Sequence, residues 1–80
     1  MNIIIVGCGK VGQTLAERLS REEGHNVTVV DTKSSIIREL TGALDIIGVE
    51  GSGASLETLL EAGVKDADIL IAVTNSDEVN

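Results

Sequence analysis

The sequence has no proline, tryptophan, tyrosine or phenylalanine, and it has one cysteine and one histidine among its 80 residues. A single cysteine cannot form a disulfide within the chain, and together with a single histidine it cannot supply the four ligands of a structural zinc site. A lone thiol is typical of a reducing compartment, so we expect a cytoplasmic location. Because there are no aromatic side chains, any adenine ring bound here must lie between aliphatic side chains and backbone groups.

Lysine and arginine are scarce, with 6 against 13 acidic residues and a formal net charge of −7. Nucleic-acid binding needs clustered basic side chains, so this balance argues against it. It also argues against direct adsorption to anionic lipid. No stretch approaches the roughly 18 consecutive apolar residues of a transmembrane helix. The chain starts with an expected strand rather than a signal peptide. We therefore expect a domain that binds no nucleic acid and does not insert into a membrane.

Short apolar runs alternate with segments of helical periodicity along the chain. The expected strands are 2–6, 27–30, 46–49 and 69–73, and the expected helices are 10–23, 34–43 and one capped by Ser55 that stops at Gly63. Continuous apolar strands are typical of a parallel sheet covered on both faces, and right-handed crossovers give the strand order 3-2-1-4. The predicted fold class is α/β: a doubly wound (Rossmann-like) parallel sheet, truncated to about four strands with three helices.

Helical spacing also predicts which side chains face the core. The inward positions are Val11, Leu15 and Leu19 in the first helix, with small Gly12 and Ala16 beside them, and Ile36, Ile37 and Leu40 in the second. A fourth helix is expected to start at 76–78. The sheet is about half of a doubly wound domain, so strand 69–73 should be an edge. We expect association between chains through this edge or the adjacent helical face.

A glycine-rich turn joins the first strand to the first helix. Gly7, Gly9 and Gly12 follow the apolar run 3–6 with the spacing Gly-x-Gly-x-x-Gly. The first glycine permits a tight turn, the second lets the backbone approach a pyrophosphate, and the third lets the helix pack against the strand. The free amides and positive dipole end of the helix then meet the phosphate charge. The motif predicts nucleotide binding.

Asp31 ends the second strand, about 20 residues after the glycine motif, as the dinucleotide fingerprint requires. Its carboxylate can accept hydrogen bonds from the ribose hydroxyls of adenosine. The same charge repels a 2′-phosphate, so the sequence predicts NAD(H) rather than NADP(H). The structural alternative is a helix-capping or turn residue.

Several other residues have both a functional and a structural interpretation. Cys8 is expected to be a small filler, since nothing near it in the sequence depresses its pKa. Lys10 could contact an anionic ligand, but it could equally be a solvated surface residue. Lys33 is expected at the surface, although it could reach an adenosine phosphate. Thr74 and Asn75 follow the fourth strand, where α/β sheets bind ligands.

The carboxyl-terminal half adds motifs of higher specificity. The motifs are Ile4–Gly12, Val29–Asp31, Glu50–Gly53, Leu60–Gly63, Ala67–Asp68 and Ala72–Asn80. Together, over the whole chain, they resemble the N-terminal nucleotide-binding domain (TrkA-N, also called KTN or RCK) of the regulatory subunit of Trk potassium-uptake systems. The chain departs from the family at Gly51–Gly53, where many members carry Gly-Asp-Ala.

The resemblance implies a regulatory domain without catalytic activity that controls potassium uptake. Such domains bind NAD(H), or ATP and ADP, and form homo-oligomeric rings beneath a potassium-translocating membrane subunit of the Trk or Ktr type, at the inner face of the plasma membrane. Residues 1–80 would be the N-terminal part of such a domain, which continues through about two more strands. The implied nucleotide-binding residues are Gly7, Cys8, Gly9, Lys10, Val11, Gly12, Asp31, Thr32, Ser52, Gly53, Val73, Thr74 and Asn75. The resemblance implies no metal site and no catalytic residues.

Two other functions use similar glycine loops. The chain could be the cofactor-binding fragment of an NAD-dependent dehydrogenase, but it offers no substrate domain, and His25 lies at the wrong end of the first helix to donate a proton to substrate. An adenosyl-methionine site also uses a glycine loop and an acid after the second strand. The third glycine fits a pyrophosphate better, so this alternative ranks last.

Overall fold

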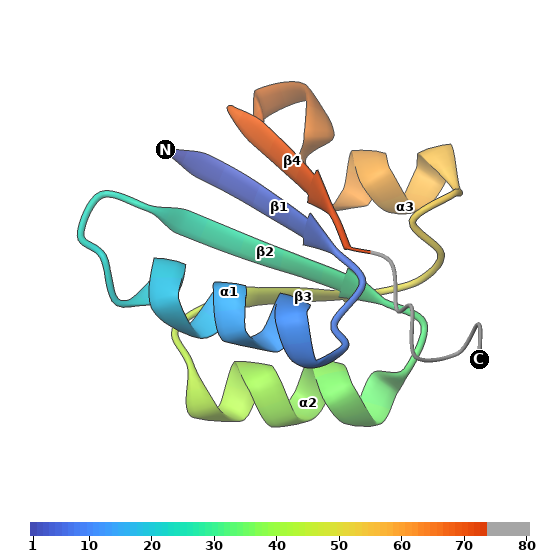
Figure 1. The fold of residues 1–80 in the computed structure, drawn as a ribbon. Coiled ribbons are helices and arrows are strands. Elements are labelled where there is room, and N and C mark those ends of the chain that lie inside the picture. Colours follow the sequence, from blue (N-terminus) through green and yellow to red (C-terminus); the bar gives the residue numbers. More distant parts are fainter. Residues whose placement is uncertain (74–80) are drawn as a thin grey trace.

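The computed structural model describes residues 1–73, which form a parallel sheet in the order β3-β2-β1-β4 with helices on both faces (Figure 1). The strands are β1 Asn2–Val6, β2 Asn26–Asp31, β3 Ile47–Glu50 and β4 Ile69–Ala72. The helices are α1 Lys10–Ser20, α2 Ser34–Ala43 and α3 Leu56–Glu61, followed by the short 3-10 turn η1 Val64–Asp66. The predicted α/β class, the strand order and the three helices are confirmed. The fourth helix predicted at 76–78 lies outside the described residues.

The sheet separates two apolar clusters. Helices α1 and α2 cover one face, where Ile5 and Val29 pair across the strands and are fully buried (Figure 1). Helix α3 and η1 lie on the other face, over Ile4, Val30 and Val49. Alternate residues of one strand point to opposite faces, so burial on both sides requires the continuous apolar runs seen in the sequence.

Helix α1 ends at Ser20, earlier than the predicted end at Glu23. The amides of Arg21 and Glu22 each donate to the carbonyl three residues earlier, at 3.3 and 3.2 Å. These bonds tighten the chain into a turn, and Gly24 completes the reversal with a φ of 86°. Polar residues continue the helical pattern past this point, which is why periodicity alone overestimates the length.

The prediction that Val11 faces the core is wrong, because its side chain is 62% exposed. The residues of α1 that are buried against the sheet are Gly12 and Ala16. Leu15 and Leu19 pack at the margin of the core as predicted. The helix approaches the turn after β1 so closely at Gly12 that a larger residue does not fit there, and the neighbouring Val11, in the first turn of α1, faces solvent. In α2, Ile37 and Leu40 are buried as predicted.

Helix α3 has the predicted cap: the hydroxyl of Ser55 accepts the amide of Thr58 at 3.4 Å. Thr58 is buried, whereas Leu56 and Leu60 are exposed. Strand β4 lies at the end of the described sheet, as predicted, and its Leu70 is 43% exposed. The apolar surface left open on residues 1–73 therefore includes α3 and β4. No helix in this part of the chain is both long and apolar enough to cross a membrane.

The close approach of α1 predicts a large difference between two glycine-to-alanine variants. A Cβ on Gly12 would overlap the backbone carbonyl oxygen of Gly7, whereas a Cβ on Gly42, in α2, meets nothing within 4 Å. We expect Gly12→Ala to lower the free energy of unfolding by about 3 kcal/mol through overpacking. Gly42→Ala should raise it by about 0.5–1 kcal/mol through the lower entropy of the unfolded chain.

Urea unfolding followed by circular dichroism measures both changes on the same scale. A Gly12→Ala variant as stable as the wild type would contradict the packing described here.

Candidate functional site

The carboxyl ends of three neighbouring strands meet at one edge of the sheet. Gly7 follows β1, Asp31 ends β2 and Val73 follows β4. The amide of Gly7 donates to the carbonyl of Val30, and the amide of Val73 donates to the carbonyl of Val6, both at 2.8 Å. In open α/β sheets this edge, where the strand order reverses, is where ligands bind.

The turn after β1 depends on two glycines. Gly7 has a φ of 93°, a conformation that side chains rarely adopt, and a Cβ there would overlap the carbonyl oxygen of Val73. The carbonyl of Gly7 in turn lies against Gly12 of α1. The first and third glycines of the motif therefore occupy the tight turn and the close helix contact that their spacing predicts.

Helix α1 begins next to this turn. Gly9 is its N-cap and provides no side-chain cap. The amides of Lys10, Val11 and Gly12 have no acceptor inside the helix because they belong to its first turn. They carry the positive end of the helix dipole, which favours a bound anion.

Asp31 connects the glycine turn to the start of the next loop. Its Oδ2 accepts the amide of Cys8 at 2.8 Å, and its Oδ1 accepts the amide of Lys33 at 2.8 Å. An ionised carboxylate has about four lone-pair sites, so each oxygen keeps one for a further donor. Asp31 is thus a turn residue, as the structural alternative held, and it also retains acceptors for ribose hydroxyls.

Cys8 is fixed by burial of its side chain and by hydrogen bonds to its backbone. Its side chain is fully buried, its amide donates to Asp31, and its carbonyl accepts the side-chain amide of Gln13 at 2.9 Å. Burial, and secondarily the negative charge of Asp31, raises the pKa of the Cys8 thiol from 9.0 to about 11. The thiol is therefore neutral at physiological pH, as expected for a filler.

These elements enclose a cavity of about 230 Å³. It is lined by Gly7, Cys8, Gly9, Asp31, Thr32, Lys33, Ile36 and Val73. The volume lies below the about 300–1,000 Å³ typical of small-molecule sites. Lys33 is exposed and Ile36 packs against the core, both as expected, and both also line the cavity. Both residues follow Asp31 closely, near the start of α2, and this position in the sequence could have predicted that they line the cavity.

The other described residues predicted for the site do not line this cavity. Lys10 and Val11 are exposed in the first turn of α1, and Gly12 lies buried beneath it. None of the three lines the cavity. Thr74 and Asn75 lie outside the described residues.

Ser52 and Gly53 belong to the loop between β3 and α3 and do not line the cavity either. The hydroxyl of Ser52 accepts the amide of Ala54 at 3.1 Å, within the loop itself. A Cβ on Gly53 would overlap the side chain of Val6, at the end of β1. The loop therefore packs against β1 at Gly53, and Ser52 is exposed.

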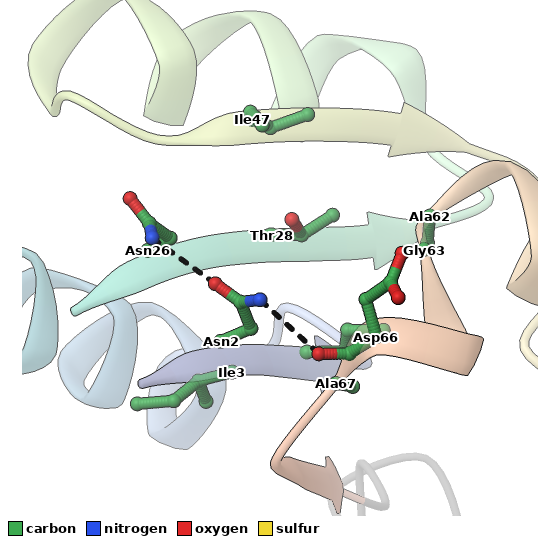
Figure 2. A pocket seen from close by; sticks show the side chains of 10 residues that line it. Asn2, Ile3, Asn26, Thr28, Ile47, Ala62, Gly63, Asp66 and Ala67 are labelled. Atoms are coloured by element: carbon green, nitrogen blue, oxygen red, sulfur yellow. Dashed lines mark hydrogen bonds between the residues drawn. The ribbon is translucent and has the colours of Figure 1, made fainter.

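A larger cavity, of about 280 Å³, lies at the amino ends of the strands (Figure 2). Its polar groups bond to one another: the side-chain amide of Asn26 donates to Asn2 at 3.0 Å, and that of Asn2 donates to the carbonyl of Asp66 at 3.1 Å (Figure 2). Thr28 and Ile47 form part of its floor. Its one glycine, Gly63, precedes the three-residue turn η1, and neither a Gly-x-Gly-x-x-Gly motif nor the start of a long helix lines it, so it does not resemble a nucleotide site.

The histidine lies away from the glycine turn. The Nε2 atom of His25 is 2.9 Å from a carboxylate oxygen of Glu22, near the amino end of β2. The side chain of His25 is partly buried. Within residues 1–73, no group of three or more histidine, cysteine, aspartate or glutamate side chains is placed to hold a metal ion.

The raised pKa of Cys8 predicts how stability depends on pH. The unfolded chain loses the thiol proton near pH 9, whereas the folded chain keeps it to about pH 11. Unfolding then releases a proton, so this contribution to stability is present below pH 9 and is lost as the pH rises to about 11. We expect the unfolding free energy of the wild type to fall more steeply over this range than that of Cys8→Ala.

Urea titrations of both proteins at pH 8, 9, 10 and 11 measure the difference. Parallel pH profiles for the two proteins would show that folding does not perturb this thiol.

Comparison with known proteins adds independent information. The family model described as the TrkA-N domain matches residues 3–80. The chain is 58% identical over 80 residues to a "Trk system potassium uptake protein TrkA" of Halomonas elongata, and 48% identical to the protein of that name from Vibrio alginolyticus; it covers 17% of the length of each. It is 36% identical to a homolog from Methanothermobacter thermautotrophicus and covers 37% of that protein.

Each of these matches extends over all 80 residues of the chain. The family match includes the glycine turn, Asp31 and the strand ends that form the cavity. The chain belongs to the TrkA-N domain family.

Proposed function

We propose that residues 1–80 are the N-terminal part of a nucleotide-sensing domain that regulates potassium uptake. The ligand is NAD(H), or ATP or ADP bound in the same adenosine half-site. The observation that carries the proposal is the position of Asp31, which lies beside the glycine turn in a cavity at the switch point of the sheet. The acid at this position can accept hydrogen bonds from a ribose, and the start of the neighbouring helix can bind a phosphate.

The polar groups fit the two charged or polar parts of such a ligand. The first-turn amides of α1 provide donors for a diphosphate without any positive net charge on the chain. The free lone pairs of Asp31 accept from ribose hydroxyls, and its charge repels a 2′-phosphate. Ile36 offers an aliphatic surface, as expected where no aromatic side chain exists to contact adenine.

In this proposal the domain acts as a regulator and not as an enzyme. Relatives are named as potassium-uptake proteins, and this name supports a membrane potassium-translocating subunit as the partner. The exposed apolar residues of α3 and β4 support contacts with further chain segments or with other copies, in a homo-oligomer at the inner face of the membrane. Nucleotide binding regulates transport only if the ligand has different affinities for two conformations of this assembly.

A dehydrogenase fragment finds no support in the described residues. Hydride transfer in such enzymes needs a proton donor near the nicotinamide, and His25 pairs with Glu22 at the amino end of the sheet. We therefore do not adopt this alternative.

The proposal predicts selective binding that depends on one carboxylate. The wild type should bind NADH or ADP at least about tenfold more tightly than NADPH, because Asp31 accepts from the ribose hydroxyls and repels a 2′-phosphate. Asp31→Asn should weaken NADH binding by about tenfold and narrow the difference from NADPH. Isothermal titration with NADH, NAD⁺, ATP, ADP and NADPH measures these affinities.

Glu50→Gln is the matched control. Glu50 pairs with Asp31 in register on β3 and is exposed, but it does not line the cavity. The control removes the same charge one strand away, so its affinities should stay within about twofold of the wild type. Absence of binding by the folded wild type, or equal binding of NADH and NADPH, would refute the proposed site.

A further inference from the structure

The glycine turn is oriented by side chains as well as by its glycines. The two peptide units on either side of Cys8 are each held by a side chain from a different element. Asp31 accepts the Cys8 amide at 2.8 Å, and Gln13 of α1 donates to the Cys8 carbonyl at 2.9 Å. A backbone carbonyl can only accept, so the NH₂ end of the Gln13 amide must face it. The contact between Gln13 and the Cys8 carbonyl is not part of the sequence fingerprint, which consists of the three glycines and the acid.

The orientation of the Cys8 carbonyl determines the orientation of the next amide. The peptide between Cys8 and Gly9 is trans and planar, so its C=O and N–H point in opposite directions. Gln13 holds the carbonyl toward α1, and the amide of Gly9 therefore points away from that contact. Gly9 lines the cavity, and no acceptor within residues 1–73 takes its amide.

A rotated peptide would place the wrong group at the site. If the Cys8 carbonyl turned toward the cavity, a partial negative charge would replace an N–H donor beside the expected phosphates. Glycine at position 9 has no side chain to oppose such a rotation, since Gly populates both signs of φ readily. The half-buried side chain of Gln13 opposes it.

From these contacts we propose that Gln13 is a positioning residue for the diphosphate of the nucleotide. It touches no ligand; it holds the Cys8 carbonyl so that the Gly9 amide is available to a phosphate oxygen. The inference rests on the proposed function, because a nucleotide diphosphate is the ligand that it serves.

The test compares two variants on the same turn of α1. Gln13→Met keeps an unbranched side chain of similar length and removes the donor. Thr14→Val removes a different side-chain bond, from the hydroxyl of Thr14 to the carbonyl of Lys10 at 2.9 Å, and leaves Cys8 untouched. ADP and adenosine are the probes, since they differ by the diphosphate alone.

We expect Gln13→Met to weaken ADP binding about tenfold and to leave adenosine binding within about twofold, whereas Thr14→Val should leave both within about twofold. In ¹H–¹⁵N spectra of the 80-residue chain, the Gly9 amide should shift on addition of ADP in the wild type and much less in Gln13→Met. A general loss of structure would instead weaken both probes and move many resonances.

The outcomes separate this inference from the proposed function. No ADP binding by the folded wild type would refute the nucleotide site itself. Wild-type binding that Gln13→Met retains at full strength, or an equal loss for ADP and adenosine in that variant, would overturn the positioning role alone.

Discussion

The site depends on the contact between the backbone of Gly7 and Gly12, where α1 lies directly on the turn after β1. The Gly7 carbonyl points at the helix, so the amide on the other side of the same peptide, that of Cys8, points away toward Asp31. This contact places the first turn of α1 at the carboxyl edge of the sheet. It also leaves room beneath α1 only for small residues, and Ala16 supplies the next of them.

The chain has a net charge of −7 and yet is proposed to bind an anion, and the site shows how these features coexist. At physiological ionic strength the Debye length is about 8 Å, so exposed carboxylates elsewhere are largely screened from the cavity. The helix amides act at hydrogen-bond distance, where screening is weak. Asp31 is the carboxylate that lines the cavity, and its oxygens already accept backbone amides. The groups at the cavity itself, namely the helix amides, Asp31 and Lys33, therefore matter more for a bound anion than the overall charge does.

The sequence predicts the architecture because each part of it has a local signal. Apolar runs give the parallel strands, the glycine spacing gives the turn, and chain handedness gives the strand order. Sequence patterns predict the position of a side chain poorly where that position depends on how closely two elements pack. Val11 has the right period for the core, but it lies in the first turn of α1 and is exposed. Gln13 is a polar residue on a helix, and only the orientation of one peptide plane gives it a role.

Close packing also joins the glycine turn to the end of β4. The Gly7 turn lies so close to the carbonyl of Val73 that no Cβ fits between them. The glycine turn therefore cannot move toward Val73 unless the end of β4 moves as well. Close-packed interiors respond to such displacements by moving elements rather than by compressing. If the site binds a nucleotide as proposed, a ligand that favours one position of the glycine turn also favours one position of the end of β4, and regulation requires a difference in affinity between two such positions.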